Sequence, residues 1–167
     1  MTTPTKDTPP DLLAPEGLMM EIDESVRNRL VAAGRFETLA VGHQIATQDR
    51  PHYAISATVS GKVAVSCRSR DDNVVIDELG PGDIIGEMSV IDYPHVASAD
   101  VIVLDRPAHV WTIDGEAFDT FIESDPKMGL AVMRLLAREL CCVIRHNSVS
   151  MLKQAEALRF HYQDMDY

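Results

Sequence analysis

Residues 79–99 combine turn residues, a carboxylate and a histidine in an order that could bind a small anion. The stretch reads LGPGDIIGEMSV and continues, after three residues, with PHVASA. Glycine at position 86 has no Cβ atom and so lets a ligand approach the backbone closely. A short helix beginning near Met88 would direct its free amides at an anion. Together with Glu87 and His95, these features make the stretch the strongest candidate for a functional site.

This order of residues resembles the phosphate-binding cassette of the cyclic-nucleotide-binding domains, as in catabolite activator proteins, protein kinase A regulatory subunits and cyclic-nucleotide-gated channels. The family pattern is a strand, a Gly-Asp turn, Gly-Glu-Leu-Ala-Leu on a short helix, and Pro-Arg-Ala-Ala-Thr at the start of the next strand. Gly42 before HQI, and the segment VSGKVAV at 59–65, also match family turns. The resemblance covers about residues 21–147 and implies a mainly β, double-stranded β-helix jelly-roll.

The resemblance also implies a ligand, cAMP or cGMP, and a set of contact residues. These are Gly86, Glu87, Met88, Ser89, His95, Val96, Ala97 and Ser98. By resemblance, Glu87 would accept a hydrogen bond from the ribose 2′-hydroxyl. Ala97 and Ser98 stand where the family has small residues whose amide and hydroxyl face the phosphate or the base. The alternatives are a solvated carboxylate at Glu87 and a hydroxyl bonded to its own backbone at Ser98.

One position departs from the family pattern. His95 stands where the family has the arginine that clamps the cyclic phosphate, and the segment that leads to it is slightly shorter than usual. Losing a charge-assisted hydrogen bond removes about 1.5–3 kcal/mol, which is about a tenfold to hundredfold loss of affinity. Protonated His95 would restore one positive donor. The sequence therefore leaves open a weakened or altered pocket, an empty one, and an exposed loop histidine without a ligand role.

Other catalytic or metal chemistry is not indicated. The six histidines show neither His-x-His nor His-Glu-x-x-His spacing, so a metal enzyme of the related cupin architecture is disfavoured. Cys67, Cys141 and Cys142 lack CxxC spacing and are odd in number, which favours reduced thiols over a disulfide or a zinc site. We therefore predict no catalytic residue, no metal and no cofactor.

Composition and charge narrow the class of partner. The net charge of −11 argues against a nucleic-acid partner, because DNA binding depends on Lys and Arg that neutralise phosphates. No window approaches the roughly 20 apolar residues of a membrane span, and residues 1–10 are polar, unlike a signal peptide. These features predict a cytoplasmic protein that contacts neither nucleic acid nor membrane.

The elements expected around the cassette are short. A helix over about 21–33 is followed by β-type runs separated by turn residues, which favours a sandwich or barrel over a parallel sheet. The expected strands are 36–41, 52–59, 62–67, 73–79, 99–104 and 109–113. Asp114 is expected to cap the next helix, and Ser124-Asp125-Pro126 to start the last one.

The last helix carries a seam typical of a coiled coil. Every seventh residue is apolar, at Leu130, Ala137, Ile144, Met151 and Leu158, with Met133 and Leu140 three residues after the first two. The stripe could cover the chain's own barrel over its first turns, but a homodimer through this helix is expected beyond His146. Asn147 would fall at an inward position, and the poor helix formers at 147–150 could break the helix.

These observations predict three parts and one function. The parts are a flexible arm at 1–20, a cyclic-nucleotide-binding-like barrel with flanking helices at 21–125, and a dimerising helix and tail at 126–167. Too few residues follow Ser150 for a helix-turn-helix, so no DNA-reading domain is expected. The predicted function is a non-enzymatic sensor module for a cyclic mononucleotide. The alternative is a degenerate domain that binds no nucleotide and serves as a dimeric interaction module for an unknown protein partner.

Overall fold

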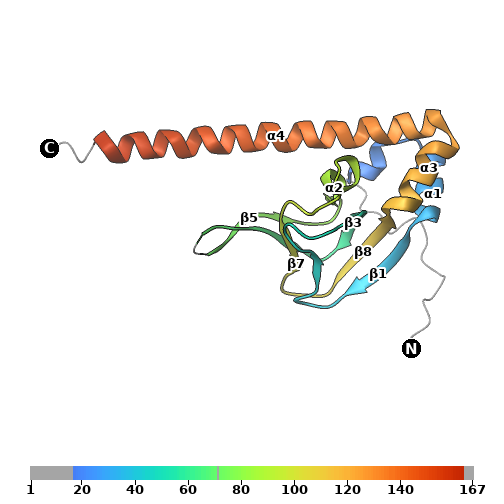
Figure 1. Ribbon diagram of the computed structural model, residues 1–167, viewed down its shortest axis with the longest axis horizontal. Helices are drawn as coiled ribbons and strands as arrows, with labels where there is room; N and C mark the ends of the chain where they lie inside the picture. Colours follow the sequence, from blue (N-terminus) through green and yellow to red (C-terminus); the bar gives the residue numbers. More distant parts are fainter. Residues whose placement is uncertain (1–16, 71, 164–167) are drawn as a thin grey trace. The chain divides into compact units, whose positions relative to one another are not determined.

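The structure is a computed structural model, and it describes residues 17–70 and 72–163 (Figure 1). The predicted arm at 1–20 lies mostly outside the described residues. The strands are β1 (Arg35–Leu39), β2 (Gln44–Ala46), β3 (Ala54–Ser60), β4 (Val63–Arg68), β5 (Asn73–Leu79), β6 (Ile84–Ile85), β7 (Asp100–Val103) and β8 (Ala108–Asp114). The helices are η2 (Leu18–Glu21), a 3-10 turn, and α1 (Glu24–Ala33), α2 (Glu87–Ile91), α3 (Gly115–Ser124) and α4 (Pro126–Gln163).

The strands form two antiparallel sheets, as expected for the predicted jelly-roll. One sheet has the order β1-β8-β3-β6 and the other β2-β7-β4-β5. Most neighbouring strands are distant in sequence, since β1 pairs with β8 and β2 with β7, whereas β4 and β5 are consecutive. The fold is therefore the mainly β jelly-roll predicted above, with a short N-terminal helix and a long C-terminal helix.

The core lies between the two sheets and is built from small branched and methyl side chains. Its cluster comprises Ala46, Val63, Ile85, Ala97, Val101, Val103, Ala108 and Val110. In β7, Val101 and Val103 are buried on one face, as the period of two in a strand requires. Ala97 belongs to this cluster, so the candidate cassette is anchored directly in the core.

The helices α1 and α3 lie side by side at the end of β8 (Figure 1). Asp23 caps α1 by accepting a hydrogen bond from the Ser25 amide at 2.9 Å. The Ser25 hydroxyl also donates to this carboxylate at 2.6 Å, and this bond, followed by the one from the amide, lowers the pKa of Asp23. The buried ring of Trp111 in β8 donates from Nε1 to the Val31 carbonyl at 3.1 Å. One indole thus ties the first helix to the central strand of a sheet.

Several predicted boundaries change, and one predicted role is wrong. The first helix begins at Glu24 instead of 21, the strand predicted from 52 begins at Ala54, and the one predicted to 41 ends at Leu39. The carboxylate of Asp114 does not cap α3; it accepts a hydrogen bond from the Arg35 guanidinium at 2.7 Å. A charged donor on the neighbouring strand competes successfully for that carboxylate.

The last helix is continuous through the poor helix formers at 147–150. Its start agrees with the prediction, because Asp125 accepts hydrogen bonds from the amides of Lys127 at 3.0 Å and Met128 at 3.3 Å. The chain divides into two compact units, one ending at Val132 and one starting at Met133.

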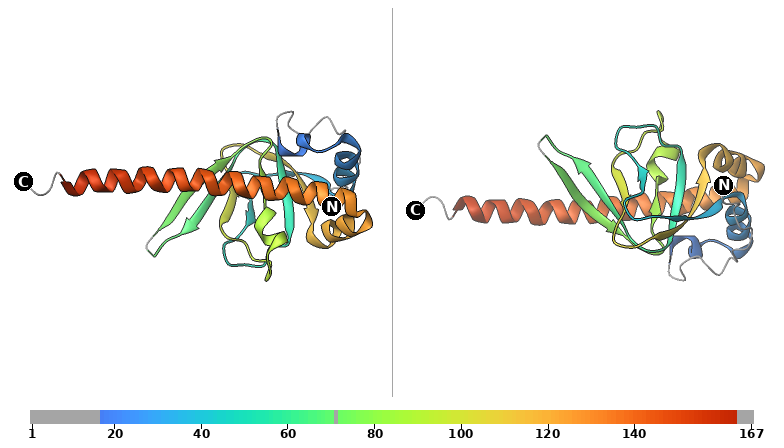
Figure 2. Two further views of the ribbon diagram at one scale, coloured as in Figure 1. Left: turned by 90° about the horizontal axis from the view of Figure 1, so that it is seen from above. Right: turned by 90° about the horizontal axis from the view of Figure 1, so that it is seen from below.

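The hairpin of β4 and β5 extends beyond the other strands of its sheet (Figure 2). In β5 the side chains of Val74, Val75 and Ile76 are all more than half exposed. Within the part of the chain that the structure describes, no helix has the length and apolarity needed to cross a membrane.

Candidate ligand-binding site

The candidate site begins at Gly86, which ends β6 and starts α2. Gly86 adopts a left-handed φ of 94°, a conformation that L residues rarely adopt. A Cβ atom here would lie 2.3 Å from the Ala54 carbonyl oxygen and 2.9 Å from Nε2 of His52. Both the φ angle and the close approach therefore require glycine at this position.

The turn at residues 80–83 fixes the start of β6, the strand before Gly86. The Asp83 carboxylate accepts a hydrogen bond from the Gly80 amide at 2.7 Å, and the Asp83 carbonyl accepts one from the Thr58 amide at 2.9 Å. Ile84 and Ile85 are buried and pair with β3. The Gly-Asp turn thus fixes where Gly86 emerges from the barrel.

Helix α2 carries the next three candidate residues. Glu87 is its first residue and is half-buried, whereas 49% of Met88 is exposed. Ser89 is buried and its hydroxyl donates to the Gly86 carbonyl at 2.7 Å. Ser89 thus stabilises the turn, while Glu87 and Met88 occupy its more open side.

His95 closes the loop that follows α2. Its Nδ1 lies 2.7 Å from the Ser89 carbonyl oxygen, and because a carbonyl can only accept, this ring nitrogen carries the proton. The His95 amide donates to the Asp92 carbonyl at 3.1 Å, and its φ is 61°, also left-handed. The hydrogen bond through Nδ1 therefore fixes the imidazole to helix α2.

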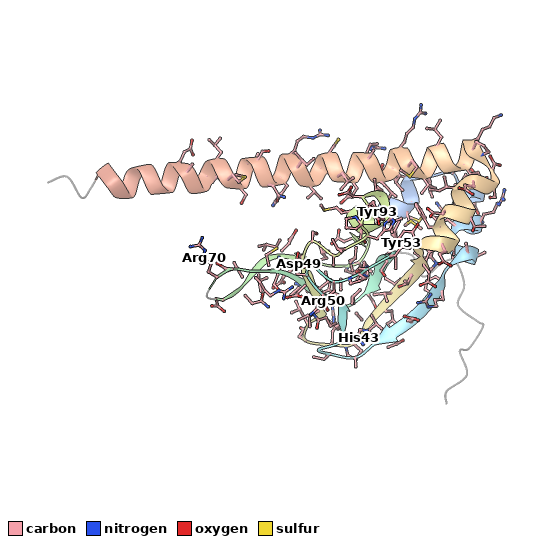
Figure 3. The ribbon with its side chains drawn as sticks, in the orientation of Figure 1. His43, Asp49, Arg50, Tyr53, Arg70 and Tyr93 are labelled. Atoms are coloured by element: carbon pink, nitrogen blue, oxygen red, sulfur yellow. The ribbon has the colours of Figure 1, made fainter. Side chains whose placement is uncertain are left out.

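Two tyrosines flank the His95 ring. The ring of Tyr53 lies against it, with centroids 4.1 Å apart and planes tilted by 30°. The ring of Tyr93 meets it edge-on at 5.7 Å and is 82% exposed. Figure 3 shows both tyrosines near one another, well away from Arg70 in the β4–β5 hairpin. This aromatic group sets the orientation of His95.

The chain after His95 pairs with residues 48–51. The Ala97 amide donates to the Arg50 carbonyl at 3.0 Å, and the Ala97 carbonyl accepts from the Asp49 amide at 2.8 Å. Val96 forms a bridge with Pro51 and is 38% exposed. The Ala97 amide is therefore already hydrogen-bonded within the protein.

Ser98 lies beside two sulfur atoms. Its hydroxyl is 3.8 Å from Sδ of Met88, and its carbonyl is 3.9 Å from Sγ of Cys67 on β4. Ser98 and Met88 are both exposed. The start of α2 and the segment entering β7 thus face one another through these side chains.

A charged network holds the turn that pairs with Ala97. Asp100 is buried, and its carboxylate accepts from the Gln48 amide at 2.8 Å and from the Gln44 side chain at 3.1 Å. The Arg68 guanidinium lies 3.8 Å from Asp100, 3.7 Å from Asp49, and donates to the Gln48 carbonyl. Arg68 is therefore balanced by two carboxylates at the edge of the site.

His52 lies beneath the Gly86 turn. Its amide donates to the His95 carbonyl at 2.8 Å. Its Nε2 is buried without a hydrogen-bond partner of good geometry among the described residues. Burial lowers the pKa of this imidazole, because the charged form loses solvation. His52 is thus a neutral ring packed against the cassette backbone.

The structure brings the predicted residues into one cassette in two groups. Gly86, Ser89 and His95 are joined by hydrogen bonds, and Met88 contacts Ser98. His52 and Tyr53, which lie just before β3, were not predicted as site residues. No sequence signal marks them, since they lie about forty residues away and their contact depends on the folded register. Among the described residues, no group of three or more His, Cys, Asp or Glu side chains could hold a metal.

Comparisons with known proteins match the same architecture. A CRP-like cAMP-activated global transcriptional regulator of Mycobacterium tuberculosis is 26% identical over 132 residues, which cover 78% of this chain. Those residues are 58% of the regulator, so this chain spans well under two thirds of that relative.

Solved structures share the fold at low sequence identity. A cyclic nucleotide-binding domain from Methylobacillus flagellatus superposes with a TM-score of 0.74 and 22% identity, covering 80% of this chain and 74% of that one. The catabolite activator protein of Thermus thermophilus gives a TM-score of 0.65 and 21% identity, covering 80% of this chain and 62% of that one. The N-terminal domain of a Streptomyces coelicolor transcriptional regulator gives 0.67 and 23%, covering 84% and 95%.

The family itself is identified by sequence. The cyclic nucleotide-binding domain matches residues 36–125, more than half of the 167-residue chain. That range includes every residue of the cassette. This chain belongs to the cyclic nucleotide-binding domain family.

Proposed function

We propose that this chain is a non-enzymatic sensor module that binds a cyclic mononucleotide, cAMP or cGMP, at the cassette of residues 86–98. The observation that carries the proposal is the left-handed Gly86 at the N-cap of α2, which forms the turn at which the family pattern places the phosphate. The relative from Mycobacterium tuberculosis is named as cAMP-activated, which favours cAMP as the first ligand to test.

Each polar group of the cassette has a distinct role in this proposal. Glu87 accepts a hydrogen bond from the ribose 2′-hydroxyl, and the phosphate is held by backbone amides near Met88 and Ser98. His95 supplies the only positive charge of the cassette itself, through Nε2 when the ring is protonated. Because a histidine replaces the family arginine, affinity is lower than in arginine-containing relatives by about tenfold to hundredfold.

Calorimetric titration with cAMP and with cGMP tests this proposal. We expect saturable binding of at least one nucleotide, and a Glu87→Gln variant that binds about tenfold to hundredfold more weakly. Asp92→Asn is the matched control, because it removes the same charge from an exposed residue at the end of α2. Absence of binding for both nucleotides would instead favour the degenerate interaction module.

We also propose that the chain forms a homodimer through α4. The supporting observation is a stripe along this helix that no described part of the chain covers: Leu130 is 53%, Ile144 63% and Met151 69% exposed. Neighbouring Met128 and Val132 are buried, so the helix has a second, separate apolar face. A second copy of the same helix about a two-fold axis is the simplest cover for this stripe.

The organisation along the chain belongs to the same proposal. Residues 21–125 form the sensor barrel with its helices, and the helix that starts at residue 126 is the dimerising element. No catalytic step, metal or cofactor is assigned to any of them. The partner that reads the signal is a protein that recognises the dimer, and neither nucleic acid nor membrane is part of the proposal.

A further inference from the structure

The segment Pro51–Tyr53, just before β3, contacts the cassette on one side. The His52 amide donates to the His95 carbonyl at 2.8 Å, and the Tyr53 ring stacks on the His95 ring at 4.1 Å. The His52 ring also fills the space beneath Gly86. A shift of His95 or Gly86 therefore acts directly on this segment.

The same segment contacts helix α3 on its other side. The Tyr53 carbonyl accepts a hydrogen bond from the Gly115 amide at 2.8 Å, and the Tyr53 hydroxyl donates to the Asp119 carboxylate. The ring of Tyr53 lies so close to Gly115 that a Cβ atom there would be 2.3 Å from it. The hydrogen bond to Asp119 raises the pKa of Tyr53, so the hydroxyl keeps its proton and remains a donor.

We propose that Tyr53 is a positioning residue that couples the state of the cassette to helix α3. One face of its ring packs against the ring of His95. Its carbonyl accepts a hydrogen bond from the first turn of α3, and its hydroxyl donates one to the second turn. An aromatic side chain has only two rotatable bonds, so a displacement of the His95 ring is transmitted through Tyr53 with little absorbed by side-chain rotation. Helix α3 is followed by Asp125 and α4, and the coupling thus leads from the cassette towards the proposed dimer helix.

The identity of the ligand that drives the coupling rests on the function proposed above, whereas the contacts that make up the coupling do not. If ligand binding shifts α3, then a change at α3 must shift the cassette by the same free energy. Couplings of this kind usually amount to about fivefold to 150-fold in an equilibrium constant. The connection can therefore be tested from the α3 side without any nucleotide.

The first experiment is hydrogen exchange of the ligand-free full chain, read at peptides spanning residues 86–98. In Asp119→Ala, which removes the acceptor of the Tyr53 hydroxyl, we expect cassette amides to exchange at least about fivefold faster. Glu123→Ala is the matched control, another exposed acidic residue of the same helix. If Asp119→Ala speeds exchange only within α3, or if both variants act alike on the cassette, the coupling is wrong.

The second experiment adds cAMP and compares the wild-type chain with Tyr53→Phe, which keeps the ring but loses the hydroxyl. We expect cAMP to slow exchange in both the cassette and α3 of the wild type, and in the cassette alone in Tyr53→Phe. Tyr93→Phe, from the exposed tyrosine on the other side of His95, should behave as the wild type. Equal slowing of α3 in Tyr53→Phe and wild type would overturn the coupling.

The two proposals fail in different ways. If cAMP and cGMP leave the wild-type exchange unchanged and give no heat, the sensor function fails, and the ligand-free comparison of Asp119→Ala with Glu123→Ala still decides the coupling. If nucleotide binds but Tyr53→Phe changes nothing, the sensor function stands and the coupling through Tyr53 falls.

Discussion

The backbone of Gly86 runs over the imidazole of His52 so closely that a Cβ atom on this glycine would lie 2.9 Å from Nε2. The His52 ring thus packs directly against the turn that starts α2. This contact, together with the left-handed φ of Gly86, explains why the cassette depends on His52, which lies just before β3.

Replacing Gly86 with alanine should therefore disrupt the cassette. The left-handed conformation alone costs an L residue about 1–2 kcal/mol, and the contacts with Ala54 and His52 add a steric penalty. We expect Gly86→Ala to lower the free energy of unfolding by more than this range and to abolish nucleotide binding. Denaturant unfolding and calorimetry provide the two measurements.

Substitutions at two other glycines separate the cost of the left-handed backbone from the cost of the steric contacts. Gly42 also has a positive φ, 79°, but a Cβ atom there meets nothing within 4 Å, so Gly42→Ala should lose about 1–2 kcal/mol only. At Gly80, a Cβ atom likewise meets nothing, and Gly80→Ala should be nearly neutral. Equal losses for Gly42→Ala and Gly86→Ala would show that the contact with His52 is unimportant.

Charge at position 95 should control affinity for nucleotide. In His95→Arg a permanent cation replaces the imidazole, and we expect cAMP to bind about tenfold to hundredfold more tightly. His43→Arg, at an exposed turn residue, adds the same charge outside the cassette and should leave affinity unchanged. Calorimetric affinities that do not differ between wild type and His95→Arg would show that the phosphate lies elsewhere.

Burial of His52 predicts how stability changes with pH. Its pKa is lowered in the folded chain, so below the ordinary histidine pKa of about 6.5 the unfolded chain binds a proton that the folded chain does not. The free energy of unfolding should therefore fall as the pH drops through that value towards the lowered pKa. His52→Gln should flatten this fall relative to the wild type, as measured by denaturant unfolding across the range.

The control for this measurement is His43→Gln, which removes an exposed imidazole instead of a half-buried one. Its stability profile should run parallel to that of the wild type. A His52→Gln profile that also runs parallel would mean that His52 binds its proton equally well in the folded and unfolded chains.

The proposed dimer should depend on the exposed stripe of α4. Ile144 is 63% exposed in the single chain, so Ile144→Asp should leave the barrel folded but place a charge in the seam and yield monomers. Val149→Asp alters an equally apolar but off-stripe residue, 54% exposed, and should remain dimeric. Light scattering at micromolar concentration tests both, and a monomeric wild type would contradict the dimer.

What the sequence by itself determined is the part of the molecule encoded locally. Short β-type runs between turn residues predicted a sandwich or barrel, the resemblance to the family predicted the jelly-roll, and Asp125-Pro126 marked the start of α4. The order of Gly86, Glu87 and His95 located the cassette, because a turn glycine, a helix start and a strand start follow directly along the chain. These features need only neighbours in sequence, so they could be predicted without coordinates.

Only the tertiary structure decided the contacts between distant segments. The strands β2 and β6, of three and two residues, are too short to show a period and exist because β7 and β3 pair with them. Likewise, Asp114 bonds Arg35 instead of capping α3, and Tyr53 lies between His95 and Asp119. The partners in these pairs are separated by about thirty to eighty residues, and a change of one residue in strand register would turn the side chains of a strand to the opposite face.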